Sequence, residues 1–582
     1  MCYDNSMPKR NGAVHVATIK TKASGGRVYT SYLLRRSYRE GGRVQHENLG
    51  NLSHLPLPAI EAVRRVLAGE TLVSAQDSFS VQRSLPHGQV AAVLGVLREL
   101  DLERVLSRER SRERDLVVAL LCQRLISPGS KLSATRRFGQ TTLAEELELG
   151  AVSEAELMGA LDWLLSRKDR IERTLARRHL TPGGFVLYDL SSSYFEGRSC
   201  PLAALGYSRD ARRGRLQVNY GLICSPEGRP VAVEVFPGNT PDQETFPSVL
   251  EAVTTRFFMS RVIFVGDRGM ITRAQAETLR KQGAGFITAL RSAQVRSLLS
   301  SGALQLSLFD EVNLAEITSP EFPDERLIVC RNPLMAAERA RKREALLAAT
   351  ETELAQVKAM VESPRGRLRA APAGVIGERV GRVANRFKVA KHFTLAIADG
   401  AFSFSRKDAQ IQEEAALDGF YVLRTTSSKE ELGAQAVVRA YKQLKEVEEA
   451  FRTLKSPEVE IRPIYHHLED RVRAHIFLCM LAYYVAFSLK ERLAPLLFTD
   501  DTPLAPLDPV ATARRSESAK AKAGSGRTED GFVCHTLRDL LAELGTLCRH
   551  TVRVGTSEHT FTQLTKPTPL QARAFELLGV RP

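Results

Sequence analysis

The sequence has no apolar run long enough to span a membrane. Its longest, from Ile476 to Leu489, is closed by Lys490, whereas a spanning helix needs about 20 such residues. We therefore predict a buried core helix here. The first residues, Met1-Cys-Tyr-Asp-Asn-Ser, also lack the basic and then apolar pattern of a signal peptide. We expect a cytoplasmic protein with no membrane attachment.

Cysteine, tryptophan and nucleotide-binding motifs are equally scarce. The chain has 8 Cys among 582 residues and no Cys-x-x-Cys pair, which argues against a disulfide framework and against a cysteine-based zinc site. The single Trp, Trp163, lies in an apolar stretch and is predicted to anchor a core. No Gly-x4-Gly-Lys-Ser/Thr loop is present, so nothing indicates ATP binding.

Positive charge is in surplus. There are 82 Lys and Arg against 67 Asp and Glu, a net charge of +15, which favours a polyanionic partner such as nucleic acid. Eight basic residues fall within 364–391 against one acid, and four Arg fall within 209–215 against Asp210. Each cluster by itself is more typical of a solvated surface than of a binding site.

The spacing of apolar residues divides the chain into parts with different predicted secondary structure. Residues 14–50 predict short strands, and residues 58–178 are helical in pattern. The next part reads strand, strand, strand, helix, strand, helix, strand. Its predicted elements are strands 184–190, 216–224 and 229–236, helix 245–258, strand 261–267, helix 271–282 and strand 286–290.

The remaining sequence is mixed. It predicts a long charged helix, 335–362, as half of a helical hairpin, and two strands, 393–398 and 420–425. Helices 430–455 and 470–492 follow. Residues 511–528 are rich in Ala, Ser, Lys, Arg and Gly, which predicts a flexible linker. The tail, 532–578, is long enough for one helix and a short hairpin.

Two acids end neighbouring buried strands. Asp189 closes the first core strand and Asp267 closes the fourth. A pair of carboxylates at adjacent strand ends makes a hard-oxygen site suited to Mg²⁺ or Mn²⁺. The strand order outlines the first half of a ribonuclease H-like fold, which would take a third carboxylate from a later helix.

The helix at 440–455 offers three Glu for that role. Its buried stripe is predicted to be Leu444, Val447, Phe451 and Leu454. Glu446 and Glu449 then point into solvent, whereas Glu448 lies at the edge of the stripe and can reach the sheet. Tyr441 and Lys455, seven residues to either side, share the face of Glu448. Alone, this pattern is also that of an ordinary amphipathic helix.

Together these residues resemble the DDE transposases of bacterial insertion sequences, in the branch with a Tyr-x2-Arg-x3-Glu-x6-Lys signature. Tyr441, Glu448 and Lys455 fit the spacing, but Leu444 stands at the Arg position, so Lys445 or Arg452 is the candidate substitute. Further stretches that resemble one subgroup are Gly206–Asp210, Pro237–Asp242, Asp418–Tyr421 and Arg462–His466.

The resemblance implies an α/β protein with a ribonuclease H-like core, interrupted by an inserted subdomain and preceded by a small β segment and a helical domain. It implies an enzyme of the bacterial cytosol that cleaves insertion-sequence ends and transfers them into target DNA, acting as a homodimer on terminal inverted repeats. The expected divisions are a β-rich segment 1–82, a helical DNA-binding domain 83–180, core halves 181–291 and 428–495 around an insertion 292–427, and a linker and tail 496–582.

The resemblance also implies site residues. Asp189, Asp267 and Glu448 would be catalytic and would hold two Mg²⁺ or Mn²⁺ ions. The expected DNA contacts are Tyr441, Lys445, Arg452, Lys455, Arg268, Arg379, Arg382 and Arg386. Two alternatives stay open: a DNA-binding relative that has lost activity, and a structure-selective nuclease of the same fold.

Three further points stay open in the sequence. If an aromatic side chain stacks on a DNA base, Phe387, Phe393 and Phe402 are the candidates. Recognition of the element end falls either to the helical block 83–180 or to the β-rich segment 14–50. His466, His467 and His475 lack a carboxylate at a zinc-motif spacing, so we expect them not to bind metal.

Overall fold

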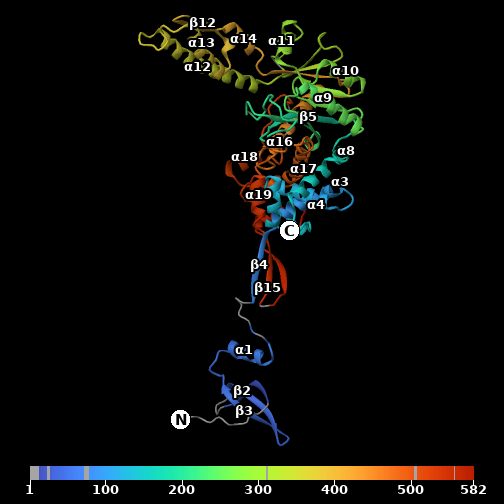
Figure 1. The fold of residues 1–582 in the computed structure, drawn as a ribbon, viewed down its shortest axis with the longest axis vertical. Coiled ribbons are helices and arrows are strands. Elements are labelled where there is room, and N and C mark those ends of the chain that lie inside the picture. Colours follow the sequence, from blue (N-terminus) through green and yellow to red (C-terminus); the bar gives the residue numbers. More distant parts are fainter. Residues whose placement is uncertain are drawn as a thin grey trace. The chain divides into compact units, whose positions relative to one another are not determined.

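The computed structural model describes residues 12–22, 27–70, 72, 78–210, 212–309, 312–503, 508–555 and 557–582 (Figure 1). The chain divides into two compact units. One comprises residues 1–84 and 549–565, and the other comprises residues 85–548 and 566–582. All of the acids singled out above belong to the larger unit.

The smaller unit is built from antiparallel strands, as its β-rich sequence predicts. One sheet contains β1 (Ala13–Lys22), β2 (Val28–Glu40) and β3 (Arg43–Asn51), in that order, and α1 (Leu57–Leu67) follows it. The β2–β3 turn is formed by Gly41 and Gly42, both at positive φ, where glycine is favoured. A second sheet joins β4 (Phe79–Pro86), β15 (Cys548–Val554) and β16 (Thr560–Leu564).

An eight-stranded mixed sheet lies at the centre of the larger unit, in the order β10-β11-β14-β9-β8-β5-β6-β7. Strands β5, β8 and β9 are parallel neighbours, and the other pairings are antiparallel. The strands are β5 (Phe185–Tyr194), β6 (Gln217–Cys224), β7 (Pro230–Pro237), β8 (Ile263–Gly266), β9 (Gly285–Ala289), β10 (Leu314–Ile317), β11 (Arg326–Arg331) and β14 (Phe420–Thr425). The five predicted core strands are therefore confirmed.

The segment 292–427 only partly forms a subdomain of its own. Its strands β10, β11 and β14 extend the central sheet beyond β9. Its middle part has a separate hydrophobic cluster that includes Leu347, Ile376 and Phe402, and α12 packs on α13 as the predicted helical hairpin. That part contains α12 (Pro333–Glu362), α13 (Ala373–Phe387), β12 (Phe393–Ala398), β13 (Ala401–Arg406) and α14 (Asp408–Ala415).

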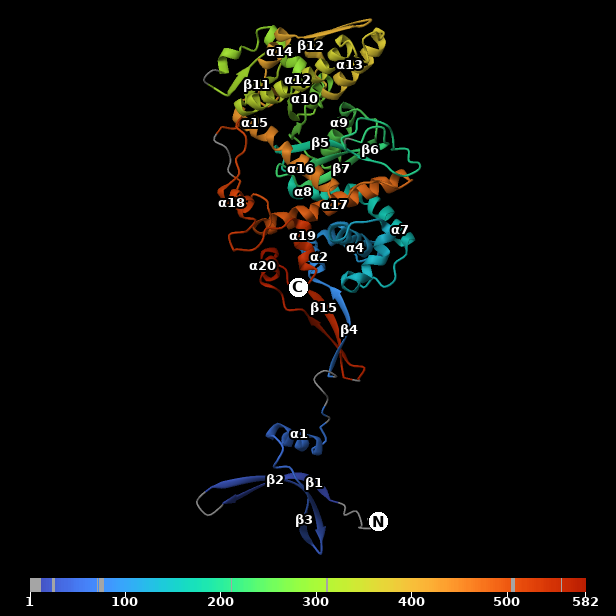
Figure 2. The same ribbon diagram turned by 90° about the vertical axis from the view of Figure 1, so that its left-hand side faces the viewer.

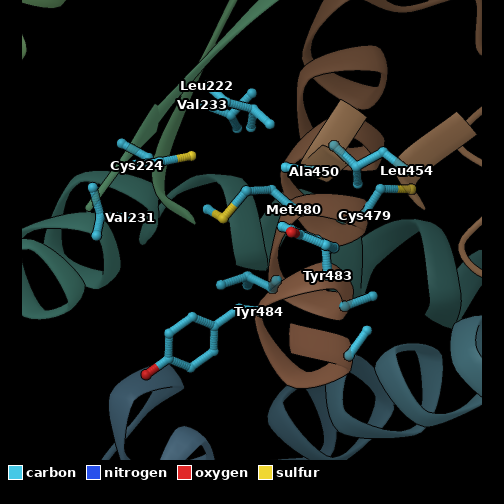
Figure 3. Close-up of a cluster of buried hydrophobic side chains, with 14 of the residues drawn as sticks. Leu222, Cys224, Val231, Val233, Ala450, Leu454, Cys479, Met480, Tyr483 and Tyr484 are labelled. Atoms are coloured by element: carbon cyan, nitrogen blue, oxygen red, sulfur yellow. The ribbon is translucent and has the colours of Figure 1, made fainter. Parts of the chain in front are cut away.

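Helix α17 (Glu469–Leu493) is the predicted buried helix and lies at the centre of the largest hydrophobic core. It packs against α4 (Arg112–Ile126) and α7 (Glu154–Leu165) on one side and against β7 and α16 (Leu444–Lys455) on the other (Figure 2). Met480 and Tyr483 of α17 face Leu222, Val233 and Ala450 (Figure 3). The helix, with the short turn after it, is long and apolar enough to cross a membrane, but 89% of its most apolar window is buried inside the protein.

The helices of residues 83–180 share this core rather than having one of their own. Their buried side chains pack directly on α17 and on the sheet. Trp163, on α7, is partly buried against the core and has the Arg167 guanidinium 4.0 Å from its ring centre. The helices are α2 (Gly88–Glu99), α3 (Leu102–Leu106), α4 (Arg112–Ile126), α5 (Lys131–Arg137), α6 (Leu143–Glu146), α7 (Glu154–Leu165) and α8 (Lys168–His179).

Two predicted elements differ from the structure. The helix predicted at 430–455 is two helices, α15 (Ala434–Lys442) and α16 (Leu444–Lys455), because the chain tightens where the Gln443 amide donates to the carbonyls of both Arg439 and Ala440. The helix predicted at 245–258 begins earlier, as α9 (Asp242–Glu251), and ends in one π-helical turn. Helices α10 (Arg273–Lys281) and α11 (Ser292–Ser300) flank β9 in sequence.

The predicted linker and tail are more ordered than their composition indicates. Residues 511–528 include α18 (Glu517–Ser525), whose Ser516 cap accepts a hydrogen bond from the Ala519 amide. Helix α18 has almost no large apolar side chains to bury. It is held instead by an ion pair between the buried Lys522 and Asp501, at 3.0 Å. The tail has two helices instead of one, α19 (Leu537–Leu544) and α20 (Pro569–Leu578), around the β15–β16 hairpin.

We predict that a buried ion pair holds the extended part of the sheet. Arg424 of β14 donates two hydrogen bonds of 2.7 Å to Glu325, and both side chains are buried. Arg424→Met leaves the Glu325 carboxylate buried without its partner, which costs about 3–5 kcal/mol. We expect a clear fall in the temperature of thermal unfolding.

Two controls accompany this variant. Arg341→Met removes an exposed pair with Glu338 and should leave the unfolding temperature nearly unchanged. Adding Glu325→Leu to Arg424→Met removes the orphaned charge and should restore part of the loss. An unfolding temperature that is the same for Arg424→Met and the unmodified protein would show that the pair contributes nothing.

Candidate catalytic site

Asp189, Asp267 and Glu448 line one cavity of about 280 Å³. Asp189 lies on β5, Asp267 follows β8 directly, and Glu448 lies on α16. Because β5 and β8 are parallel with Tyr188 opposite Gly266, the next residue of each strand is one of the two acids. The strand register therefore brings Asp189 and Asp267 together.

The electrostatics of Asp189 show that the three carboxylates interact. Burial, together with the negative charges of Asp267 and Glu448, raises its pKa to about 7. A hydrogen bond from the Leu190 amide, 2.8 Å from Oδ1, and the positive charge of Arg209 oppose that rise in pKa. A cation in the cavity would favour the ionised carboxylate.

Asp267 is held by two hydroxyl groups. The Tyr441 hydroxyl donates to Asp267 Oδ1 at 3.5 Å, and the Thr288 hydroxyl donates to the Asp267 carbonyl at 2.8 Å. Burial and the charge of Asp267 raise the pKa of Tyr441, so the phenol stays protonated. Tyr441 thus lies at the acids, on the face of the helical segment that its spacing from Glu448 predicts.

Helix α16 presents Glu448 to the cavity and buries its neighbouring stripe. Leu444, Val447 and Leu454 are buried as predicted. Glu449 is exposed and pairs with Arg452. Glu446 is partly exposed and its carboxylate lies 3.3 Å from the exposed Lys445 ammonium, while its Cβ packs against Gly228 in the β6–β7 turn.

Asp210, the acid within the Arg-rich stretch 209–215, is a buried ion-pair partner. Its side chain is 1% exposed and forms ion pairs with Lys455, at 2.8 Å, and with Arg462. It also accepts a hydrogen bond of 3.1 Å from the Tyr194 amide at the end of β5. Lys455, only 12% exposed, is therefore directed at Asp210 and does not line the acid cavity.

Comparison with known families identifies the chain. Residues 186–485 match the family described as transposase DDE domain, and residues 16–80 match the IS1634 family transposase N-terminal domain. The first match covers more than half of the sequence and contains all three acids. The chain belongs to the DDE transposases. It is an α/β enzyme with a ribonuclease H-like core, a DNA-cleaving and strand-transferring transposase of insertion-sequence type.

Two solved structures resemble the transposase over parts of its length. The first is a piggyBac transposase synaptic complex with hairpin DNA, at 9% identity and a TM-score of 0.35, covering 79% of this chain and 80% of that one. The second is a Mos1 transposase paired-end complex with the left transposon end, at 17% identity and a TM-score of 0.14, covering 31% and 59%. No curated protein matches the sequence.

The other expected DNA contacts of the transposase lie in different places. Arg268 and Lys445 line the acid cavity, whereas Arg452 is exposed on α16. Arg379, Arg382 and Arg386 are exposed on α13 of the insertion. Arg382 pairs with Glu378 and Arg386 pairs with Glu353, so both have intramolecular partners in the absence of DNA.

Sequence reasoning missed the residues that the insertion contributes to the cavity. Asn332, Met335 and Arg339, at the start of α12, line it together with Tyr421 of β14. No local motif marks Asn332, Met335 and Arg339, because they reach the acids through the pairing of β11 with β14 and of β14 with β9. Arg339 in particular adds a cationic side chain to the lining of the cavity.

The candidate stacking aromatics all pack in the hydrophobic cluster of the insertion. Phe393 and Phe402 are buried in the cluster of the insertion, and Phe387 packs against the same cluster. A stacking role for these three Phe is therefore not supported by their placement.

His475 is buried in the main core and bonds to protein groups.

DDE transposases use divalent metal ions, and the donor chemistry of the cavity fits such ions, since it offers carboxylate oxygens and a phenol. In the part of the chain that the structure describes, however, no three His, Cys, Asp or Glu side chains are placed to hold a single ion together. Ions held by all three acids would require the side chains of Asp189, Asp267 and Glu448 to adjust.

We predict that Asp210 positions the end of the third-acid helix. Asp210→Asn leaves Lys455 and Arg462 without their carboxylate, which costs about 3 kcal/mol or more when the partners are largely buried. We expect a lower unfolding temperature, and reduced DNA cleavage although no acid of the cavity is changed. The control is Asp169→Asn, which removes an exposed carboxylate from Arg256 and should alter neither property. Unchanged stability of Asp210→Asn would refute the positioning role.

Proposed function

We propose that Asp189, Asp267 and Glu448 are the catalytic acids of the transposase and that they hold two Mg²⁺ or Mn²⁺ ions. The observation that supports this most directly is that one cavity collects three carboxylates from three separate elements within the matched DDE domain. Asp189, with its pKa raised to about 7 by burial and by its acidic neighbours, is the carboxylate that gains most from a nearby cation.

The residues of the chain then have distinct roles. When bound, a pair of ions stabilises charge on the attacking and leaving oxygens of a phosphodiester. Tyr441 orients Asp267 through its hydroxyl. Arg268, Lys445 and Arg339 line the same cavity and supply positive charge to the DNA backbone. Exchange of one phosphodiester for another requires no ATP, in keeping with the absence of a nucleotide-binding motif.

The proposed DNA substrates are terminal inverted repeats and target DNA, handled by a homodimer, since two element ends must meet. Recognition of the ends is assigned to the segment 14–50 rather than to the helices of 83–180. The basic stretch of those helices has intramolecular partners: Arg110 and Arg114 pair with Asp115, and Arg112 pairs with Glu156. Two-stranded β ribbons can read a DNA groove as helices do.

The two alternatives differ from transposition in their products. Retention of all three acids in one cavity counts against an inactive relative. A structure-selective nuclease would release cut DNA without joining it to a second molecule. Strand transfer is therefore the reaction that separates the alternatives.

We predict that single Ala substitutions of Asp189, Asp267 and Glu448 abolish cleavage and joining of a labelled element end in Mg²⁺, with DNA binding largely retained. Glu449→Ala is the matched control, because Glu449 is next in sequence yet pairs with exposed Arg452, and it should cleave normally. Sizing the labelled products on a denaturing gel checks this. Normal cleavage by Glu448→Ala with loss in Glu449→Ala would overturn the choice of third acid.

We predict phosphate contacts from the insertion. Each phosphate neutralised contributes about 0.9 to the slope of log affinity against log salt concentration. Changing Arg379, Arg382 and Arg386 to Glu should weaken binding to every DNA sequence and flatten that slope. The control is Arg341→Glu, an exposed residue elsewhere on the insertion. An unchanged salt slope in the triple variant would mean that this face of α13 is only solvated.

A further inference from the structure

A second cavity of about 850 Å³ lies apart from the acids, within the larger unit. One wall comes from the helical segment, with Arg124 of α4 and the loop from Gly129 to Lys131. The other wall comes from residues 460–475, which lie in the segment that joins α16 to α17 and in the first turns of α17. No step of the proposed catalytic chemistry uses this cavity.

Two cations on the cavity wall are buried without a carboxylate partner. Arg124 is 6% exposed and Lys131 is 5% exposed. Over the described residues neither forms an ion pair. Arg124 donates at 3.4 Å to the Glu460 carbonyl, and Lys131 Nζ lies 2.9 Å from His475 Nδ1. Buried charges in proteins are ordinarily paired, so these two are exceptional.

Two histidines on the wall, His466 and His475, do not add charge of their own. His475 Nε2 bonds to the Ile461 carbonyl at 2.9 Å, which makes Nε2 the donor and Nδ1 the acceptor from Lys131. Burial lowers the pKa of His466 to about 3 and that of His475 well below its usual value. Burial and the charge of Arg124 lower the pKa of Lys131 to about 7, as expected for a cation that lacks an anion.

Other charges around the cavity are mostly basic and partly exposed. Arg462 and Arg471 lie on its wall, and the acids there, Glu154 and Glu460, are both exposed. Arg471 makes only a long contact of 3.6 Å with Asp162, and its Nε is buried without a hydrogen-bond partner. The cavity therefore presents several N–H groups and few competing carboxylates to a ligand.

We propose that this cavity binds a phosphate group of the DNA backbone through Lys131, Arg124 and Arg471. An anion there supplies the missing counter-charge for both buried cations. A phosphate oxygen accepts from ammonium and guanidinium groups alike. The neutral imidazole of His466 neither repels nor neutralises the ligand, and His475 has no N–H left for it because Nε2 donates to the Ile461 carbonyl.

The connection of this cavity to the acids favours DNA as the source of the phosphate. Arg462 lies on its wall and pairs with Asp210, which also holds Lys455. Lys455 lies seven residues beyond Glu448 on α16, roughly 10 Å along the helix. Ile464 bridges to Phe195, next after β5. The cavity wall is thus continuous with the two elements that carry Asp189 and Glu448. The identification of DNA as the source of the phosphate rests on the proposed function, whereas the binding of a phosphate group in this cavity does not.

The test uses Lys131→Met and Arg124→Met in the full chain. Inorganic phosphate should raise the unfolding temperature of the unmodified protein, and this rise should be lost in both variants. In the binding of an element-end duplex, each variant should reduce the slope of log affinity against log salt by about 0.9. The matched control is Arg136→Met, on the same helix as Lys131 but exposed and outside the cavity.

The other outcomes are distinct. If both variants unfold at lower temperature without phosphate and keep the full salt slope, the cations are structural and the proposal is wrong. If phosphate stabilises the protein but the DNA slope does not change, the cavity takes a free phosphate compound and the DNA assignment is wrong. The Asp189→Ala protein gives the same binding data without cleavage, so loss of catalysis alone leaves this test unaffected.

Discussion

Helix α17 is apolar around most of its circumference, so it is stable in water only when protein covers it on every side. That requirement organises the larger unit. The helical segment covers one side of α17, and the sheet with α16 covers the other. Burial of one helix thus fixes the distance between the sheet, which carries Asp189 and Asp267, and the helix that carries Glu448.

The acid site depends on this arrangement at two further points. The parallel register of β5 and β8 places the two Asp residues side by side. At the far end of α16, Lys455 and Arg462 meet on the buried Asp210, which also binds the end of β5. Lys455 therefore forms a structural ion pair, and the positive charges that line the acid cavity belong to Arg268, Lys445 and Arg339.

The positions of basic residues in the sequence do not by themselves identify DNA contacts, because many of these residues have intramolecular partners. The Arg residues around 110–114 bind acids and carbonyl groups within the helical segment. The basic run on α13 is partly paired as well. The cations that stand out are buried and unpaired, such as Lys131 and Arg124, and burial cannot be read from composition.

Much of the fold was determined by local sequence. The alternation and length of apolar runs predicted the five core strands and the buried helix, and the helical period singled out Glu448 from Glu446 and Glu449. Local pattern suffices there because each property depends on residues within a few turns or within one strand.

The tertiary structure decided what depends on distant segments. The extension of the sheet by β10, β11 and β14, and the entry of Arg339 into the acid cavity, follow from pairing between residues more than a hundred positions apart. The partner of Lys455, the order of α18 and the two unpaired cations beside His475 have the same origin. Contacts between distant segments produce no periodic pattern of residues in the sequence, so they can be identified only in the folded structure.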